Sequence, residues 1–382
     1  MKLLILTDGI QPFVIGGMQK HSFSLARQLA ILGHQVTLVH CVASSAKLPD
    51  KQEIESAFGI EAMQNLEVIG FKFPAPSWYP GHYLKESYIY SRQVYDKLKD
   101  RLSDFDFIYA KGFTAWYFLE QKSKGKALPK IGLKFHGYEM FQKPANLKMR
   151  LHNWMLSGPT KWNNVHADYI FSYGGKITQI LKDLGIVRDA IIEIPTGIDE
   201  AWIKKGQQSE TRRDFVFIGR FERRKGVEEI NHALQSLIGK KNFHFHFIGP
   251  IPPSVKIKSD QITYHGSISD KNEIRNILDR CGVLVTPSHS EGMPNVIMEG
   301  MARGLAVLTT DVGAISSVVN QENGWFVTPG DAEGLKNQIQ EIIELTDDQL
   351  RTKQESSLKR IREFTWEKIG ELTAARIAQR LI

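Results

Sequence analysis

The sequence predicts an α/β protein made of two Rossmann-like, doubly wound domains that face a central cleft. Short apolar runs of strand length alternate with amphipathic helical stretches along the chain. This order occurs twice, in two halves of similar length. Between the halves lies a polar and basic segment without apolar periodicity, at 200–213, which is typical of an interdomain linker.

The first half opens with a strand, a helix and a strand at 2–8, 21–33 and 34–42. In the loop before the helix, Gly16 and Gly17 would allow the backbone to approach a ligand closely. They do not form the dinucleotide fingerprint, because G-x-G-x-x-G is absent and no acidic residue ends the second strand. A plain turn is the alternative interpretation of this pair.

The rest of the first half has fewer clear elements. Segment 43–105 shows little periodicity, and its Pro- and aromatic-rich part at 73–83 predicts a loop or an acceptor-side surface. Four later segments predict strands, the third with a helix after it: 105–112, 131–135, 167–185 and 190–199. His136 follows one of these strands at the carboxyl edge of the sheet, where a structural and a catalytic role are both compatible with its position.

The second half repeats the order of strand and helix. A strand and loop at 214–226 precede a helix at 227–239, and a helical stretch at 347–382 ends the chain. Further strands are predicted within 243–253, 262–269 and 283–287. The last of these leads into a loop and a helix that Gly304 ends, with Pro294 in its first turn. The unpaired N–H groups at such a helix start favour an anion.

Two carboxylates, Glu291 and Glu299, lie in that loop and helix. They could be the acid and base of a glycoside hydrolase, metal ligands, or acceptors for sugar hydroxyls. The metal interpretation lacks the neighbouring Asp that an oxygen-rich site would want. Glu299 lies among apolar residues, and a carboxylate buried there would need a partner such as a ribose or a hexose.

Cationic residues follow the strand at 214–218. Arg220 and Lys225 suit a leaving diphosphate, whose developing negative charge is best met by fixed positive groups. For Arg223 and Arg224 we expect an exposed, charged turn. The two glutamates of the previous paragraph and these cations together would place a phosphate site beside a sugar site.

Composition limits the class of protein. The 382 residues, 42% apolar and 24% charged, are those of an ordinary globular protein of about two or three domains. Neither a signal-peptide core nor an apolar run near ~18 residues occurs, so a cytoplasmic protein is expected. Cys41 and Cys281 are expected to be buried, reduced thiols rather than a disulfide or a metal site.

The net charge of +7 is concentrated at 111–161, where ten Lys and Arg residues face only Glu120 and Glu139. This segment could be a solvated basic face. It could instead bind a phosphorylated or lipid-linked acceptor, or the anionic surface of a membrane. Nucleic acid is disfavoured because no recognition motif accompanies the charge.

Five motifs together resemble those of the retaining glycosyltransferases of family 4, which have the GT-B fold. They are Gly16-Gly17, FHG at 135–137, GRFERRKG at 219–226, SEGMPNVIMEGMA at 290–302 and DVGAISSVV at 311–319. One departure is that Met293 and Pro294 follow Glu291-Gly292, where the family often has EGFG, and this residue pair bears on sugar selectivity.

The resemblance implies a role for each candidate residue. Glu299 would bind the ribose of a nucleotide-sugar, and Glu291 would contact the transferred sugar. Arg220 and Lys225 would hold the diphosphate, and His136 would contact the donor sugar. Ile268 would lie by the base. Backbone groups would approach the donor at the remaining positions, Gly16, Gly17, Met293, Pro294, Asn295 and Val296.

The resemblance also implies a domain organisation and a reaction. Residues 1–199 would form the acceptor-side domain and 214–364 the nucleotide-sugar-binding domain, with a C-terminal helix at 365–382 returning to the first. The expected function is metal-independent, retaining transfer of a sugar from a UDP- or GDP-sugar to a glycan or lipid-linked acceptor, in cell-surface polysaccharide or glycolipid synthesis, without a cofactor. The alternatives are a sugar-nucleotide epimerase or hydrolase, and a non-catalytic nucleotide-sugar-binding protein.

Overall fold

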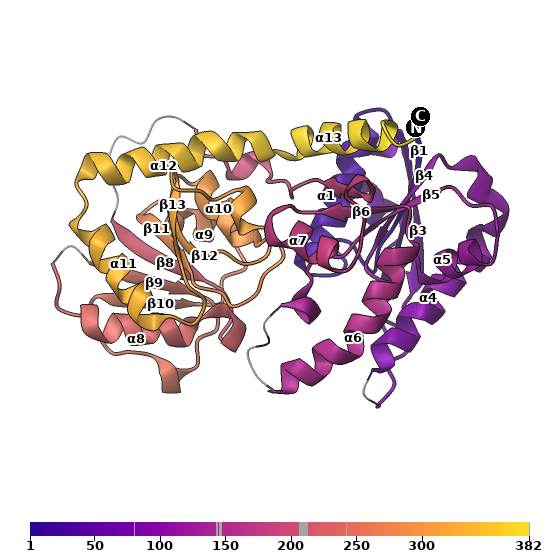
Figure 1. Ribbon diagram of the computed structural model, residues 1–382. Coiled ribbons are helices and arrows are strands. Elements are labelled where there is room, and N and C mark those ends of the chain that lie inside the picture. The colour runs from indigo at the N-terminus through magenta and orange to yellow at the C-terminus, as the bar shows by residue number, and fades with distance from the viewer. Residues whose placement is uncertain (80, 143, 145–146, 206–212, 242, 382) are drawn as a thin grey trace. The chain divides into compact units, whose positions relative to one another are not determined.

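The computed structural model describes residues 1–79, 81–142, 144, 147–205, 213–241 and 243–381. The chain forms two compact units (Figure 1). Unit 1 consists of Met1–Phe141, Lys148–Gly197 and Trp366–Ile382, and unit 2 of Gln142–Leu147 and Ile198–Thr365. Most of the predicted linker, at 206–212, lies outside the described residues.

Unit 1 is built on a seven-stranded sheet in the order β3-β2-β1-β4-β5-β6-β7. All neighbouring strands are parallel, and the central ones are apolar runs buried on both faces, as parallel sheets require. The strands are β1 (Lys2–Leu6), β2 (Gln35–Val42), β3 (Leu66–Lys72), β4 (Phe107–Lys111), β5 (Lys130–Lys134), β6 (Tyr169–Ser172) and β7 (Ile191–Glu193).

Helices cover both faces of this sheet (Figure 1). They are α1 (Gly17–Ile31), α2 (Lys51–Phe58), α3 (Ile60–Met63), α4 (His82–Leu98), α5 (Trp116–Ser123), α6 (Leu147–His166), α7 (Gly175–Asp183) and α13 (Trp366–Ala378). Segment 43–105, which showed little periodicity, in fact holds β3 and three helices. One signal was present: Asp50 and Glu53 form a capping box at the start of α2.

Helix α13 packs against α1 within unit 1. Its inward side chains Trp366, Ile369 and Ile377 are buried. A Cβ added at Gly370 would lie 2.5 Å from Cγ of Gln28 on α1, so this glycine allows the two helices to approach closely. Helix α13 is therefore part of the core of unit 1.

Unit 2 has a six-stranded parallel sheet in the order β10-β9-β8-β11-β12-β13. Its strands are β8 (Asp214–Ile218), β9 (Phe245–Ile248), β10 (Ile262–Gly266), β11 (Cys281–Thr286), β12 (Ala306–Thr310) and β13 (Gly324–Val327). Its helices are α8 (Val227–Leu237), α9 (Lys271–Leu278), α10 (Asn295–Ala302), α11 (Ala332–Glu344) and α12 (Asp347–Ile361). Phenylalanines of β8 and β9 pack against one another in its core, which includes Phe215, Phe217, Phe245 and Phe247.

Both cysteines are buried and neither forms a disulfide, as expected. No helix among the described residues is long and apolar enough to cross a membrane.

The basic segment 111–161 is not one solvated face. Lys111 and Lys134 are buried inside unit 1, at 1% and 0% exposure. Lys122 is paired with Asp168 and Lys124 with Glu120. The sequence count therefore overestimates the positive charge that this segment presents to a partner.

Candidate functional site

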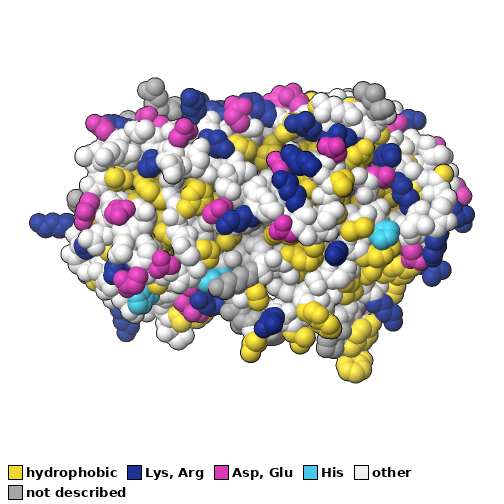
Figure 2. All heavy atoms as spheres, in the orientation of Figure 1, with side chains coloured by type: hydrophobic (Ala, Val, Ile, Leu, Met, Phe, Trp, Pro, Cys, Tyr) yellow, Lys and Arg dark blue, Asp and Glu magenta, His cyan; other side chains and the backbone are white. Residues whose placement is uncertain are grey.

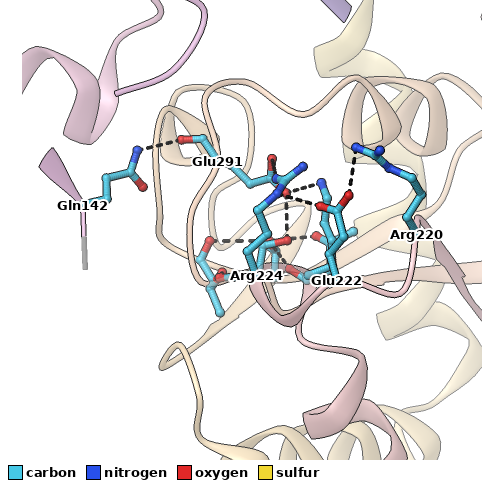
Figure 3. Close-up of polar contacts among 10 residues, drawn as sticks. Gln142, Arg220, Glu222, Arg224 and Glu291 are labelled. Carbon is cyan, nitrogen blue, oxygen red and sulfur yellow. Dashed lines mark hydrogen bonds and ion pairs between the residues drawn. The ribbon is translucent and has the colours of Figure 1, made fainter. Parts of the chain in front are cut away.

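The candidate site in unit 2 lies on the loops that follow β8 and β11, at the carboxyl ends of two neighbouring strands. Lys225 Nζ donates to Glu291 Oε1 at 2.6 Å, and Ser288 Oγ donates to the same oxygen at 2.8 Å (Figure 3). The side chains of Lys225 and Glu291 are only 17% and 9% exposed. Two of the predicted residues, 66 positions apart in the chain, thus form one partly buried ion pair.

A second carboxylate, Glu222, connects the arginines of the same loop. It lies 2.9 Å from Arg220 Nη2 and accepts from Arg224 Nε at 2.9 Å (Figure 3). Arg224 Nη1 also lies 3.6 Å from Glu291 Oε2. Arg224 is 26% exposed whereas Arg220 is 70% exposed, so the expectation that Arg224 belongs to a solvated turn is wrong. The missed signal was the acidic residue two positions before it.

Arg223 is also engaged rather than solvated. Its Nη1 donates to Glu229 Oε2 at 2.9 Å and lies 2.8 Å from His289 Nε2, which itself lies 3.0 Å from Glu229 Oε1. Burial opposes ionisation of Glu229, but the hydrogen bonds that the carboxylate accepts from Arg223, His289 and the backbone, together with the charge of Arg223, outweigh burial and lower the pKa of that carboxyl. The arginine therefore ties its loop to α8 and to the Ser288–Glu291 loop.

Three glycines allow the site loops to pack backbone against backbone. A Cβ at Gly226, where φ is 72°, would lie 2.2 Å from the carbonyl oxygen of Pro287. At Gly313, where φ is 59°, it would lie 2.3 Å from the carbonyl oxygen of Glu291. At Gly249 it would lie 1.9 Å from that of Gly219. A side chain at any of these positions would displace a loop that carries a candidate residue.

Further hydrogen bonds hold the backbone of the Glu291 loop. Gln142 Nε2 donates to the carbonyl oxygen of Glu291 at 3.0 Å (Figure 3). Thr310 Oγ1 donates to the carbonyl oxygen of Ser288 at 2.6 Å, and the N–H of Ala314 donates to that of Gly292 at 2.8 Å. The carboxylate of Glu291 is thus held by a fixed main chain as well as by its own side-chain bonds.

The loop continues into α10, which begins at Asn295 with Pro294 as the residue before its first turn. Met293 and Pro294 are buried, and Asn295 and Val296 are half-buried. Glu299 is also half-buried and interacts within the protein. Ile268 lies apart from this segment, half-buried in the loop between β10 and α9.

Unit 1 holds the other candidate residues. Gly16 precedes the first residue of α1, Gly17, and a Cβ at Gly16 would meet Gln19 Oε1 at 2.1 Å. His136 follows β5, and its Nδ1 lies 2.8 Å from the hydroxyl oxygen of Tyr173. Because a buried phenol keeps its proton, Tyr173 can donate to Nδ1, which leaves the proton of a neutral imidazole on Nε2.

The surroundings of His136 keep it neutral. Burial, together with the charges of Lys111 and Lys134, lowers its pKa to about 3. Lys134 Nζ donates to the carbonyl oxygen of Ile194 at 3.0 Å and lies 3.7 Å from the centre of the Tyr173 ring. At pH 7 the imidazole can therefore donate a hydrogen bond but carries no charge.

Lys111 and Lys134 were not among the predicted site residues. Lys111 Nζ lies 2.7 Å from His21 Nδ1, and burial lowers the pKa of both lysines well below the ordinary value. Burial also raises the pKa of Asp8 to about 6, against the attraction of Lys111. The available signal was a lysine at the end of each apolar strand, in FIYAK and KIGLK. Such a position is buried in a parallel sheet.

No group of three His, Cys, Asp or Glu side chains that could hold a metal ion occurs in the described part of the chain.

Two parallel, doubly wound sheets with loop sites at their strand ends define the GT-B class of fold. A sucrose-phosphate synthase from Thermosynechococcus elongatus superposes with a TM-score of 0.74 at 16% identity, covering 100% of this chain and 98% of that one. A lipopolysaccharide outer core galactosyltransferase gives 0.72 at 15% identity, with 100% of each chain covered. At these identities the likeness concerns the fold alone.

The chain belongs to the family-4, group 1 glycosyltransferases. The model described as Glycosyltransferase Family 4 matches residues 15–202, and that described as Glycosyl transferases group 1 matches 212–345. The two matches divide the chain close to the boundary between the sheets and together include every candidate site residue.

Individual relatives match this chain either over a short part of its length or at low identity. A Bacillus subtilis glycosyltransferase, provisionally assigned to teichuronic acid biosynthesis, is 32% identical over 32% of this chain and 31% of its own length. A Staphylococcus aureus capsular polysaccharide biosynthesis glycosyltransferase is 29% identical over 35% of this chain and 37% of its own. The chain thus spans about a third of these two relatives. A glycogen synthase of Mycobacterium tuberculosis is 23% identical over 98% and 94%.

Proposed function

We propose that the protein transfers a sugar, with retention of anomeric configuration, from a nucleotide-diphosphate sugar to an acceptor hydroxyl. The ion pair of Lys225 with Glu291 is the observation that carries this proposal. It brings the phosphate-binding and sugar-binding candidates of the family motifs to one place in unit 2. The relatives named for teichuronic acid and capsular polysaccharide support an acceptor in cell-surface glycan synthesis.

The diphosphate would lie against the loop after β8. Arg220 is the most exposed of its cations, so its guanidinium can turn from Glu222 to a phosphate. Lys225 would share its ammonium between the phosphate and Glu291. Fixed cations at a leaving group lower the barrier because they meet charge that develops in the transition state. In this proposal they take the role that a metal ion has in other transferases.

Glu291 would face the transferred sugar, and Glu299 would accept from the ribose hydroxyls. The bonds that Glu291 receives from Lys225 and Ser288 hold its side chain in place, which suits a residue that orients hydroxyls and stabilises positive charge near the reacting carbon. The leaving phosphate oxygen would accept the proton of the acceptor hydroxyl. His136, neutral and with its proton on Nε2, would donate a hydrogen bond to the donor sugar.

A thermal-shift panel of UDP, GDP and their sugars tests the donor assignment. A ligand that binds only the folded state stabilises it by about 2.7 kcal/mol at a hundred times its Kd, so one nucleotide family should raise the melting temperature clearly. Glu299→Ala should reduce that shift. If no nucleotide shifts the wild type, the donor site is refuted.

Product analysis tests the reaction itself. With the stabilising donor and a glycan acceptor, NMR of the product should show the anomeric configuration of the donor sugar. Free sugar released without an acceptor would indicate hydrolysis, and an inverted product would contradict the proposed mechanism.

A further inference from the structure

Helix α6 (Leu147–His166) has the reverse of the usual amphipathic arrangement. The described side chains that it buries in unit 1 are polar, and they are Asn153, Thr160, Asn163 and Asn164, all at most 8% exposed. On the opposite face, Leu151 and Trp154 are 62% and 73% exposed, and Val165 is 54% exposed. A helix on the surface of a globular domain normally buries its apolar stripe.

Hydrogen bonds hold the polar face of α6 in place. Asn153 Nδ2 donates to the carbonyl oxygen of Glu139 at 2.9 Å, and the Tyr138 hydroxyl donates to Asn164 Oδ1 at 2.8 Å. These bonds fix which face points outward. The exposure of Leu151 and Trp154 is thus a consequence of specific packing, and burying them instead would break buried polar contacts.

The charge of α6 indicates what covers its apolar face. The helix has three Lys and Arg residues and no Asp or Glu. Arg150 and Lys161 are exposed. In Figure 2 hydrophobic side chains project at the lower edge of unit 1, where α6 and the loop before α4 lie in Figure 1. Trp78 in that loop is 95% exposed.

We propose that α6 docks on an anionic lipid bilayer, with Leu151 and Trp154 entering the interface and Arg150 and Lys161 meeting lipid phosphates. A helix of low overall hydrophobicity with Trp and Leu on one face, flanked by basic residues, is suited to lie in that interface. A second copy of the chain fits this face less well, because two such helices would bring positive charges together. The purpose of this docking rests on the proposed function, because binding to the bilayer would bring the enzyme to a lipid-linked acceptor.

Flotation with phosphatidylcholine vesicles that do or do not contain phosphatidylglycerol tests the proposal, without nucleotide or acceptor. The wild type should float only with anionic vesicles, and less at high salt. L151S/W154S should weaken binding by roughly tenfold or more, as two apolar side chains leaving the interface would. Ile60→Ser is the matched control, because Ile60 is 87% exposed on α3 and should not affect binding. R150Q/K161Q should reduce the salt dependence.

Three results would overturn the inference. These are a wild type that does not float at low salt, an L151S/W154S variant that binds like the wild type, and a dimer in sedimentation that this variant dissociates. Activity of each variant on a water-soluble acceptor separates the two proposals. Loss of vesicle binding with full activity leaves glycosyl transfer intact, and an inactive wild type that still floats refutes only the transfer.

Discussion

At the scale of single residues, Lys225 is the cation on which the donor site depends most. Replacing it by Met removes the 2.6 Å bond to Glu291 and one charge from the proposed diphosphate site. We expect turnover to fall by about a hundredfold or more, the effect of losing a preorganised donor to developing charge. The measurement is steady-state transfer from the nucleotide-sugar found by thermal shift.

Lys336→Met is the matched control, because Lys336 also pairs with a carboxylate, Glu333, but on α11. It should retain wild-type turnover. Equal activity of K225M and K336M would indicate that the loop after β8 has only a structural role.

Asp8 gives unit 1 a specific pH dependence. Its pKa is raised from 3.8 to about 6, so its contribution to stability is complete below about pH 4 and is lost as the pH rises through 6. The loss amounts to ~3 kcal/mol. Between pH 4 and 7 the free energy of unfolding of Asp8→Asn should therefore gain on that of the wild type by this amount. Urea unfolding of both proteins at the two pH values measures it, and a constant difference would contradict the raised pKa.

Sequence reasoning at this scale found residues that carry a motif and missed those that only support one. Glu291 and Lys225 were predicted and are in contact. Arg224 was assigned to solvent although a partner, Glu222, lies two positions before it. Its other carboxylate partner, Glu291, could not be predicted in this way, because it reaches Arg224 only once β8 and β11 are neighbours.

At the scale of elements, the loops of unit 2 depend on glycine at their contacts. Gly313→Ala would place a Cβ 2.3 Å from the carbonyl oxygen of Glu291, in addition to the cost of a φ of 59°. We expect it to lower the stability of unit 2 by about 1–3 kcal/mol and to weaken nucleotide binding, because the Glu291 loop must move. Thermal unfolding with and without nucleotide measures both effects.

Gly239→Ala is the control that separates the effect of backbone strain from the effect of displacing the Glu291 loop. Gly239 has a φ of 89° in the same unit, but a Cβ there meets nothing within 4 Å. This variant should lose some stability and keep its nucleotide affinity. If G313A keeps its affinity as well, the position of the Glu291 loop does not matter for binding.

Most strands of the two sheets were predictable because a parallel sheet buries both faces and so leaves continuous apolar runs. The exceptions are β3, β12 and β13, which were not among the predicted strands. The helices of segment 43–105 were harder, and α4 (His82–Leu98) follows an aromatic-rich loop that hid its start. Helix α6 was missed for a physical reason. Its residues Leu151, Trp154 and Val165 face outward and its asparagines are buried, so the usual pattern does not describe its packing.

At the scale of the whole molecule, the boundary between the two units divides the C-terminal helical stretch. The sequence indicated two halves and a returning helix, and the structure has α12 in unit 2 and α13 in unit 1, with Thr365 and Trp366 at the crossing. A boundary inside a helical stretch is not marked by a change in composition. Its position depends on which of the two cores buries each successive side chain.

Trp366 makes that division measurable. Its ring packs on Gly197, where a Cβ would lie 2.4 Å from Cδ2 of the indole, and it is 7% exposed. Trp366→Ala removes a large buried side chain from unit 1 and should cost that unit roughly 3–5 kcal/mol. Calorimetry should show one transition lowered and the other unchanged, and the unchanged one should be the transition that nucleotide raises.

The reciprocal control is Trp325→Ala, which removes a side chain packed against the core of unit 2. It should lower the nucleotide-sensitive transition and spare the other. If both variants shift a single transition by similar amounts, the two sheets unfold together. The C-terminal helix would then stabilise the whole protein and not unit 1 alone.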